Sequence, residues 1–160
     1  MFLEMKVFGL TIDPFTNVPI VILKDSDEKN ALPVWIGVLE ASAIASELEK
    51  IHFSRPMTHD LLKEVLRNLE VTVKKIEVND LKDNVYYAVI HMAGKSGSFT
   101  LDARPSDAIA LALRMGAPIF VDSDVLEKSK SMDMSKGQGK RDKGAGDLAE
   151  TLEDLPPENF

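Results

Sequence analysis

Two short strings in the sequence place an arginine and a proline directly before a predicted helix. Residues 55–60 read Arg-Pro-Met-Thr-His-Asp, and residues 102–107 read Asp-Ala-Arg-Pro-Ser-Asp. Because proline disfavours helical backbone in the residue before it, Arg55 and Arg104 are expected to be extended and to lie just outside the helices. A cation there opposes the positive end of the helix dipole, so each arginine should have a carboxylate or an anionic ligand as its partner.

The second string joins a cation to two carboxylates, because Asp102 and Asp107 flank Arg104 in the sequence. Two carboxylates beside a phosphate-binding arginine suit metal-assisted hydrolysis of a phosphodiester bond, so Asp102 and Asp107 are predicted metal ligands. Arg55 and Arg104 are predicted to bind the substrate phosphate, where they would stabilise the charge that develops during the reaction. The alternative is an Asp–Arg ion pair that locks the corner between strand and helix.

Three further side chains near predicted helix starts complete the candidate catalytic set. His59 is a candidate general base or metal ligand, and the alternative is an exposed residue in the first turn of a helix. Asp60 lies in the same turn, where the helix dipole favours a negative charge. Glu40 lies near the start of an earlier helix and could pair with Arg55 or with an arginine of the second half of the chain. The predicted catalytic residues are therefore His59, Asp60, Glu40 and Asp107.

The composition restricts which metal ion such a site could use. The chain has no cysteine and three histidines, which excludes disulfides, thiolate nucleophiles and cysteine-containing zinc sites. Carboxylates, carbonyls and histidines suit Mg²⁺, Mn²⁺ or Ca²⁺. For phosphodiester hydrolysis, the expected cofactor is Mg²⁺ or Mn²⁺.

The net charge argues against extensive contacts with duplex DNA. The 160 residues carry a formal net charge of −7 at pH 7, and residues 1–127 hold 13 basic against 19 acidic side chains. Proteins that grip long DNA through its phosphates usually show the opposite balance. Binding of nucleic acid would therefore need a local basic patch or a bridging metal ion.

The spacing of apolar residues predicts an α+β domain over residues 1–127. Strands are predicted at 3–13, 18–24, 32–36, 71–78, 85–92 and 98–103, with a short extended piece at 118–121. Helices are predicted at 41–51, 58–69, 106–115 and 124–128, with Thr58 as an N-cap. A shift of 65 positions aligns residues 1–65 with 66–127, so the domain is predicted to contain two copies of a unit with three strands and two helices.

Residues 128–160 are predicted to form a flexible polar tail. Their first part is rich in glycine, lysine and serine and has no apolar period. Elsewhere, no stretch approaches the ~20 apolar residues that a membrane helix needs, and the first residues lack the pattern of a secretory signal. We therefore expect a cytoplasmic protein without membrane contact.

Four stretches, taken in order, carry a resemblance to a known family. They read Pro-Val-Trp-Ile-Gly at 33–37, Glu-Ala-Ser-Ala-Ile-Ala at 40–45, Arg-Pro-Met-Thr-His-Asp-Leu-Leu at 55–62 and Asp-Ala-Arg-Pro-Ser-Asp-Ala-Ile-Ala-Leu-Ala at 102–112. Together they resemble the bifunctional nuclease (BFN) family, the domain of unknown function 151, over about residues 1–127. The resemblance implies a duplicated β3α2 unit in a single barrel-like mixed sheet with flanking helices. It also implies a nuclease acting on RNA and single-stranded DNA.

Two functions are open at this point. The first is a metal-assisted nuclease that uses the residues named above. The second is a non-catalytic binding or regulatory module, in which the Arg-Pro junctions are ion-pair locks and the ligand is a partner protein or a small anion. Sheets with exposed edges often pair across subunits, so a homo-oligomer, by default a dimer, is expected in either case.

Overall fold

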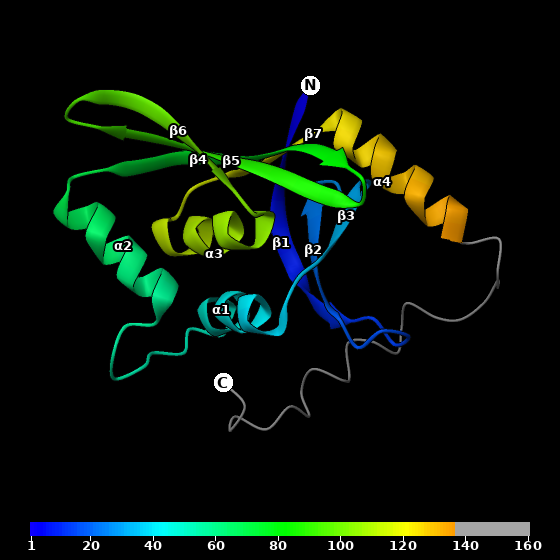
Figure 1. Cartoon of the computed structure of the whole chain (residues 1–160), viewed down its shortest axis with the longest axis horizontal. Coiled ribbons are helices and arrows are strands. Elements are labelled where there is room, and N and C mark those ends of the chain that lie inside the picture. The colour runs from blue at the N-terminus through cyan, green and yellow to red at the C-terminus, as the bar shows by residue number, and fades with distance from the viewer. Residues whose placement is uncertain (137–160) are drawn as a thin grey trace.

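The computed structural model describes residues 1–136 of the chain (Figure 1). These residues form a mixed sheet of seven strands, together with four helices. The first half holds β1 (Phe2–Ile12), β2 (Pro19–Asp25), β3 (Ala31–Trp35), α1 (Val38–Leu48) and α2 (Thr58–Asn68). The second half holds β4 (Thr72–Lys82), β5 (Val85–Gly94), β6 (Gly97–Ala103), α3 (Pro105–Met115), β7 (Ile119–Asp122) and α4 (Ser123–Lys136). The predicted α+β class is confirmed.

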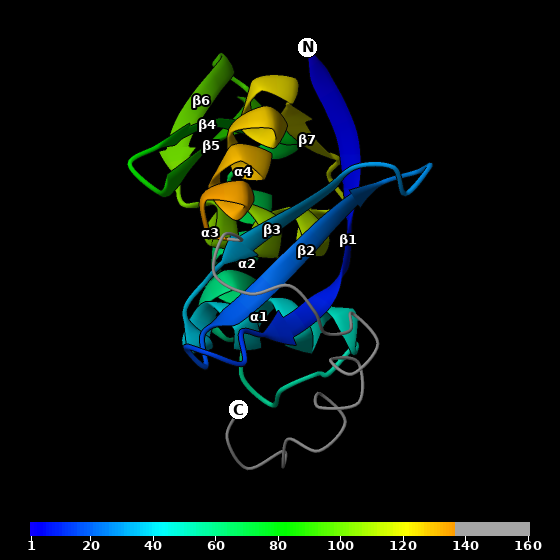
Figure 2. The ribbon, with the colours of Figure 1, turned by 90° about the vertical axis from the view of Figure 1, so that its right-hand side faces the viewer.

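The strand order divides the sheet into two antiparallel meanders. β1, β2 and β3 pair consecutively to form one, and β4, β5 and β6 form the other. The short strand β7 lies between them, antiparallel to β1 and parallel to β4. Figures 1 and 2 show the meanders as two wings that diverge from this junction, and β7 is the strand of the described sheet that connects them.

The sheet is open, so the barrel-like closure implied by the family resemblance is wrong. β3 and β6 are its two edges. β5 comes near β3, but β5 already pairs with β4 and β6 and has no free edge for a further strand. Pro33 of β3 also lacks the N–H that a ladder would need. Its carbonyl instead accepts a hydrogen bond from the Tyr86 hydroxyl of β5 at 3.2 Å. A side-chain contact therefore stands where a barrel would have a backbone ladder.

The element order repeats only in part along the chain. Both halves begin with three antiparallel strands followed by a helix, as the shift of 65 positions predicts. The second half then places β7 between α3 and α4, and no strand lies between α1 and α2 in the first half. The β3α2 unit is therefore interrupted in its second copy, and an internal duplication stays a prediction.

Helix α3 forms the centre of the core. It lies between the two wings and packs against α1, α2, β4 and β5 (Figure 1). Ala108, Ile109, Leu111 and Ala112 of this helix are buried, in agreement with the small polar face in its sequence. Gly116 ends the helix in the left-handed conformation with φ of 65°, which glycine adopts at little cost. Packing on all sides makes α3 a fixed support for the residues at its first turn.

The last helix is longer than the sequence predicted. α4 continues to Lys136, so residues 128–136 are helical and the predicted tail does not begin at 128. Two tertiary contacts hold this extension: Lys128 Nζ lies 3.1 Å from Asp80 Oδ1, and the buried Ser129 hydroxyl lies 3.3 Å from that of Tyr86. The remainder of the predicted tail, residues 137–160, lies outside the described residues. Across residues 1–136 there is no helix with the length and hydropathy needed to span a bilayer.

Asp80 couples α4 to the sheet, and this coupling depends on pH. Hydrogen bonds from Lys82, Lys128 and the Leu81 N–H lower the pKa of Asp80 to about 2. A carboxyl with a lowered folded-state pKa stabilises the fold above its unfolded pKa of ~4, and this contribution is lost as the pH falls toward 2. At pH 7 the wild type should melt slightly above Asp80→Asn, and the difference should shrink between pH 4 and 2. Thermal melts followed by circular dichroism measure it, and an undiminished difference at pH 2 would contradict the coupling.

Candidate active site

Three helix N-termini bring acidic residues to one region of the molecule. Glu40, Asp60 and Asp107 occupy the first turns of α1, α2 and α3. A carboxylate is stabilised there by the free N–H groups and the positive end of the helix dipole. Because α1 and α2 both pack against α3, the two halves of the chain meet at this place. α2 begins at Thr58 with Met57 as its N-cap, so the N-cap predicted at Thr58 is wrong by one residue.

The guanidinium of Arg104 binds carboxylates from both halves of the chain. Its Nη1 donates to Glu40 Oε1 at 2.7 Å, and its Nε donates to Asp107 Oδ2 at 2.9 Å. The second oxygen of Asp107, Oδ1, lies 2.9 Å from Nε2 of His59. We refer to Glu40, His59, Arg104 and Asp107 as the Arg104 cluster. Of the two partners considered for Glu40, the structure shows the arginine of the second half.

Asp107 is held in its ionised form at neutral pH. Partial burial raises the pKa of its carboxyl, but hydrogen bonds from Arg104 and His59 outweigh this and leave the pKa below its usual value. An ionised carboxylate only accepts hydrogen bonds, so Nε2 of His59 carries the hydrogen in their contact. In neutral His59 the other nitrogen, Nδ1, then holds a lone pair. Within residues 1–136 that nitrogen has no hydrogen-bond partner, and it is available as a base.

Glu40 folds back over the start of its own helix. Hydrogen bonds from its own backbone N–H and from Arg104 keep the pKa of Glu40 below its usual value, despite partial burial. A Cβ on Gly37 would collide with the Glu40 carboxylate, so glycine at this position leaves room for the arrangement. The sequence alone gave Gly37 no role, and the signal for it was its place just before a helix with an acid in the first turn.

A second arginine, Arg114, joins all three helices from inside the protein. Its side chain is 3% exposed, and its Nε donates to Asp60 Oδ1 at 2.7 Å. Its Nη1 and Nη2 donate to the backbone carbonyls of Ala110 and Ala43 at 3.0 and 2.9 Å. Asp60 Oδ2 accepts the Met57 N–H at 3.1 Å. We call this group the Arg114 lock. The sequence alone gave Arg114 no role, and the weak signal for it was a cation in the otherwise apolar second half of α3.

Asp60 therefore has a structural role in this arrangement. One of its oxygens binds Arg114 and the other caps α2, so both oxygens make structural hydrogen bonds and neither contacts the Arg104 cluster. Hydrogen bonds from Arg114 and the Met57 N–H lower the pKa of Asp60, against the effect of burial. Through Asp60, the Arg114 lock fixes the first turn of α2, in which His59 precedes Asp60. The catalytic assignment of Asp60 itself stays a prediction.

Two predicted site residues stay outside the cluster. Arg55 is exposed in the loop between α1 and α2, and Asp102 is exposed on β6, where it lies opposite Val89 in the ladder. Neither side chain makes an ion pair with another residue of the described part of the chain. The partner that helix electrostatics predicted for Arg55 is therefore not a carboxylate of residues 1–136.

The donor set does not fit a bound Mg²⁺ or Mn²⁺ in this arrangement. Both oxygens of Asp107 are hydrogen-bonded, Glu40 Oε1 binds Arg104, and Asp102 is exposed on a different element. Among the described residues, no group of three or more histidine, aspartate or glutamate side chains could hold a metal ion. The guanidinium of Arg104 sits between the carboxylates instead. The assignment of Asp102 and Asp107 as metal ligands stays a prediction.

Comparison with known proteins identifies a family model and several proteins that are similar to this chain. A family model described as the bifunctional nuclease domain matches residues 21–133. An uncharacterized protein of Mycobacterium tuberculosis is 35% identical over 126 residues, which are 79% of this chain and 75% of that protein. Bifunctional nuclease 2 of Oryza sativa subsp. japonica is 27% identical over 117 residues, and Bifunctional nuclease 2 of Arabidopsis thaliana is 25% identical over 105. The matches cover 36% and 32% of these two plant proteins. The range matched by the family model contains the Arg104 cluster and the Arg114 lock.

Proposed function

The chain belongs to the bifunctional nuclease domain family, and from this premise we propose that it hydrolyses phosphodiester bonds of RNA and single-stranded DNA. The observation that carries the proposal is the contact between His59 and Asp107 beside the guanidinium of Arg104. A histidine oriented by an ionised carboxylate is a general base, and an adjacent arginine binds a phosphate. The relatives whose names specify an activity are nucleases.

His59 supplies the base in the proposed reaction. Its Nδ1 takes a proton from a water molecule while the oxygen of that water attacks phosphorus. The bond between phosphorus and the leaving oxygen breaks, and the leaving oxygen takes a proton from solvent. His59 then returns its proton to solvent, so the reaction consumes one water for each bond cleaved. Asp107 keeps Nε2 protonated and stabilises the imidazolium while it exists.

Arg104 supplies the positive charge in the proposed reaction. Glu40 and Asp107 fix its Nη1 and Nε, and Nη2 has no partner among residues 1–136. This third nitrogen is free to donate to a non-bridging phosphate oxygen, where negative charge increases as the nucleophile attacks. The exposed cation of Arg55 is a further contact for the backbone of a longer substrate. No step of this reaction requires a metal ion, and metal assistance is a separate question for the assay.

Cleavage of labelled single-stranded RNA and DNA tests the proposal. Wild type, His59→Ala and the matched control His52→Ala, which changes an exposed loop histidine, are purified identically and assayed with Mg²⁺, with Mn²⁺ and with chelator. We expect a loss of about 10²-fold to 10⁴-fold in His59→Ala and full activity in His52→Ala. Wild-type cleavage no faster than that of His59→Ala would contradict the proposal. The assays of Asp102→Asn with Mg²⁺ and with Mn²⁺ test the predicted metal ligand separately.

A non-catalytic oligomeric module is the second candidate function, and one observation favours it. α2 and the residue that follows it turn apolar side chains outward: Leu61 is 54% exposed, Val65 45% and Leu69 63%. A group of exposed apolar side chains along one helix is typical of an interaction site. We propose that this face forms a homodimer interface. In this reading the Arg104 cluster is an ion-pair lock. Sedimentation of the wild type and of Leu61→Lys measures the oligomeric state. If both proteins sediment as monomers, the proposed homodimer is contradicted.

Arg104→Ala separates the two functions. The Arg104 side chain is 63% exposed, so solvent screens its ion pairs, and we expect a stability loss of at most about 1 kcal/mol. A nuclease should nevertheless lose about 10²-fold to 10³-fold in activity, because a phosphate contact is gone. An ion-pair lock predicts the opposite pattern, a sharp fall in melting temperature. Urea unfolding and cleavage assays measure both, with Arg67→Ala, which is equally exposed and paired with Glu64, as the control.

A further inference from the structure

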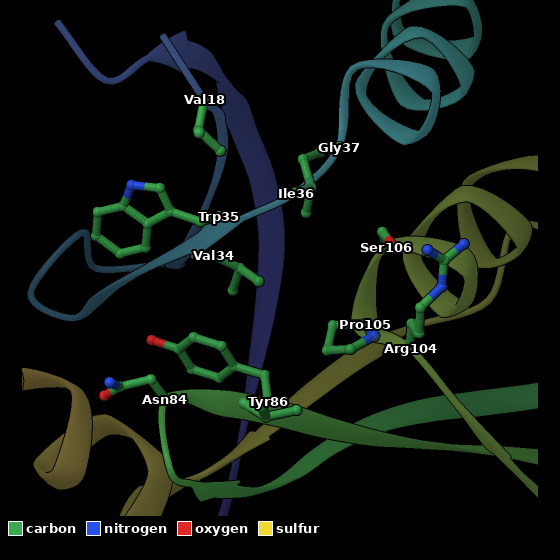
Figure 3. A pocket seen from close by; sticks show the side chains of 11 residues that line it. Val18, Val34, Trp35, Ile36, Gly37, Asn84, Tyr86, Arg104, Pro105 and Ser106 are labelled. Atoms are coloured by element: carbon green, nitrogen blue, oxygen red, sulfur yellow. The ribbon is translucent and has the colours of Figure 1, made fainter. Parts of the chain in front are cut away.

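A pocket of about 310 Å³ lies beside the Arg104 cluster, in the gap where β3 and β5 approach without pairing (Figure 3). Trp35 of β3 and Tyr86 of β5 form one end, and Arg104, Pro105 and Ser106 form the other. Among the described residues that line it there is no acid, so Arg104 is its only charged side chain. One end is therefore aromatic and the other cationic, which suits a ligand that is part apolar and part anionic.

The cationic end holds hydrogen-bond donors that the protein does not use. Ser106 is 6% exposed and lines the pocket, yet its hydroxyl has no hydrogen-bond partner in residues 1–136. This hydroxyl is not among the fully buried atoms, so it is reached through the pocket and is free to bond a ligand oxygen. The backbone N–H groups of Ser106 and Asp107 open helix α3 and also lack an acceptor in the described chain.

These donors together match the oxygens of a phosphate. The N-terminus of α3 offers two N–H groups and the positive end of the helix dipole, and Ser106 adds a hydroxyl. Nη2 of Arg104 adds a charged donor from the rim, while its other two nitrogens stay on Glu40 and Asp107. Because the carboxylates of the Arg104 cluster do not line the pocket, a phosphate there approaches from the side without acids.

The aromatic end is fixed in position by its own hydrogen bonds. The Trp35 indole N–H donates to Asp13 Oδ2 at 3.1 Å, and the Tyr86 hydroxyl donates to the Pro33 carbonyl. With these polar groups engaged, the ring carbons form a rigid wall of the pocket. Aromatic walls of this kind bind nucleobases by stacking, and they accept every base because each has a π-face.

We propose that this pocket binds one unpaired nucleotide, with its phosphate at the N-terminus of α3 and its base against Trp35 and Tyr86. The inference deepens the proposed nuclease function and rests on it. A base in the pocket cannot be stacked and paired in a duplex at the same time, so the pocket selects single strands over duplexes. It also places a phosphate within reach of Arg104, which belongs to both the pocket and the cluster.

Trp35 provides a direct signal for binding, because it is the only tryptophan of the chain. The full-length protein is titrated in chelator with adenosine 5′-monophosphate, with adenosine and with inorganic phosphate, and tryptophan fluorescence is followed. We expect saturable quenching by the monophosphate, and at least tenfold weaker binding of adenosine or phosphate alone. Ser106→Ala and Arg104→Gln should each weaken binding of the monophosphate about tenfold. Ser98→Ala, which changes an exposed serine of β6, should bind it as the wild type does.

The possible outcomes separate the pocket from the nuclease. No quenching, or equal binding by Ser106→Ala, Arg104→Gln and wild type, overturns the pocket even if cleavage is observed. Equal binding of phosphate and monophosphate also overturns it, because the base then contributes nothing. Saturable quenching that both variants weaken supports the pocket even if no cleavage is found, and in that case the nuclease function alone fails. Circular dichroism confirms that each variant is folded.

Discussion

Arg114→Met is expected to lower the free energy of unfolding by about 2–4 kcal/mol, because it leaves a partly buried carboxylate and two backbone carbonyls without their shared donor. The substitution keeps most of the volume of the side chain in a shorter, apolar chain and removes every donor. Asp60 then loses its charged partner, and the carbonyls of Ala43 and Ala110 lose their hydrogen bonds. Chemical denaturation measures the loss. Since Arg114 joins α1, α2 and α3, we also expect His59 to lose its fixed position and cleavage activity to fall.

The control for this effect is Arg67→Met, which changes an arginine of α2 that is 63% exposed and has only a surface pair with Glu64. That substitution should change stability by less than about 0.5 kcal/mol. The double variant Asp60→Asn with Arg114→Met should be more stable than the sum of the two single losses predicts, because no buried charge is then left unpaired. A loss below about 1 kcal/mol in Arg114→Met would show that the Arg114 lock does not hold the helices together.

Asp107→Asn is expected to reduce cleavage on the order of 10³-fold to 10⁴-fold while the fold persists. The carboxylate accepts from two donors, Arg104 Nε and His59 Nε2, through its two oxygens. A carboxamide has only one oxygen, so its amino group must face one of the two. If the amino group faces His59, it cannot accept a hydrogen bond from Nε2. The imidazole then carries its hydrogen on Nδ1, which is the nitrogen needed as the base. If the amino group faces Arg104, it meets the Nε–H of that arginine, which is also a donor, and the guanidinium loses this hydrogen bond.

The rate of cleavage of labelled single-stranded RNA, measured with substrate in excess, gives the size of this effect. Asp27→Asn is the matched control, since Asp27 is an exposed aspartate in the turn after β2 and is not part of the Arg104 cluster. Thermal melts show whether Asp107→Asn is still folded at the assay temperature. A folded Asp107→Asn with wild-type activity would rule out His59 as a base oriented by Asp107.

Local patterns in the sequence were enough to predict most elements of the fold. Alternation and helical periodicity located the strands and the helices α1 to α3 within a few residues, because each pattern reflects which face of one element is buried. α4 was predicted too short because residues 128–136 have no apolar period. That segment is held instead by Lys128 on Asp80 and Ser129 on Tyr86, and these contacts join residues far apart in the sequence.

The site was predictable residue by residue but not as an arrangement. The Arg-Pro strings predicted Arg104 and Asp107 because proline and helix dipoles act over a few residues. The contact between Arg104 and Glu40 spans 64 positions and depends on how α1 packs on α3, which no local pattern contains. Arg55 shares the same local signal as Arg104 but lies in an exposed loop outside the Arg104 cluster, so the signal marks a helix start without showing which arginine joins the cluster. Arg114 shows the reverse case, because its contacts with α1 and α2 are set by packing and its local signal is weak.

The position of β7 has a consequence for how the protein is made on the ribosome. β7 pairs with β1 on one side and with β4 on the other, through residues 119–122. Both meanders leave the ribosome before it, and one edge of β1 and one edge of β4 then carry unpaired backbone. Such edges are templates for pairing with other chains, so the nascent protein is most exposed to aggregation just before β7 emerges. Four residues made near the end of the described chain close both edges in a single step.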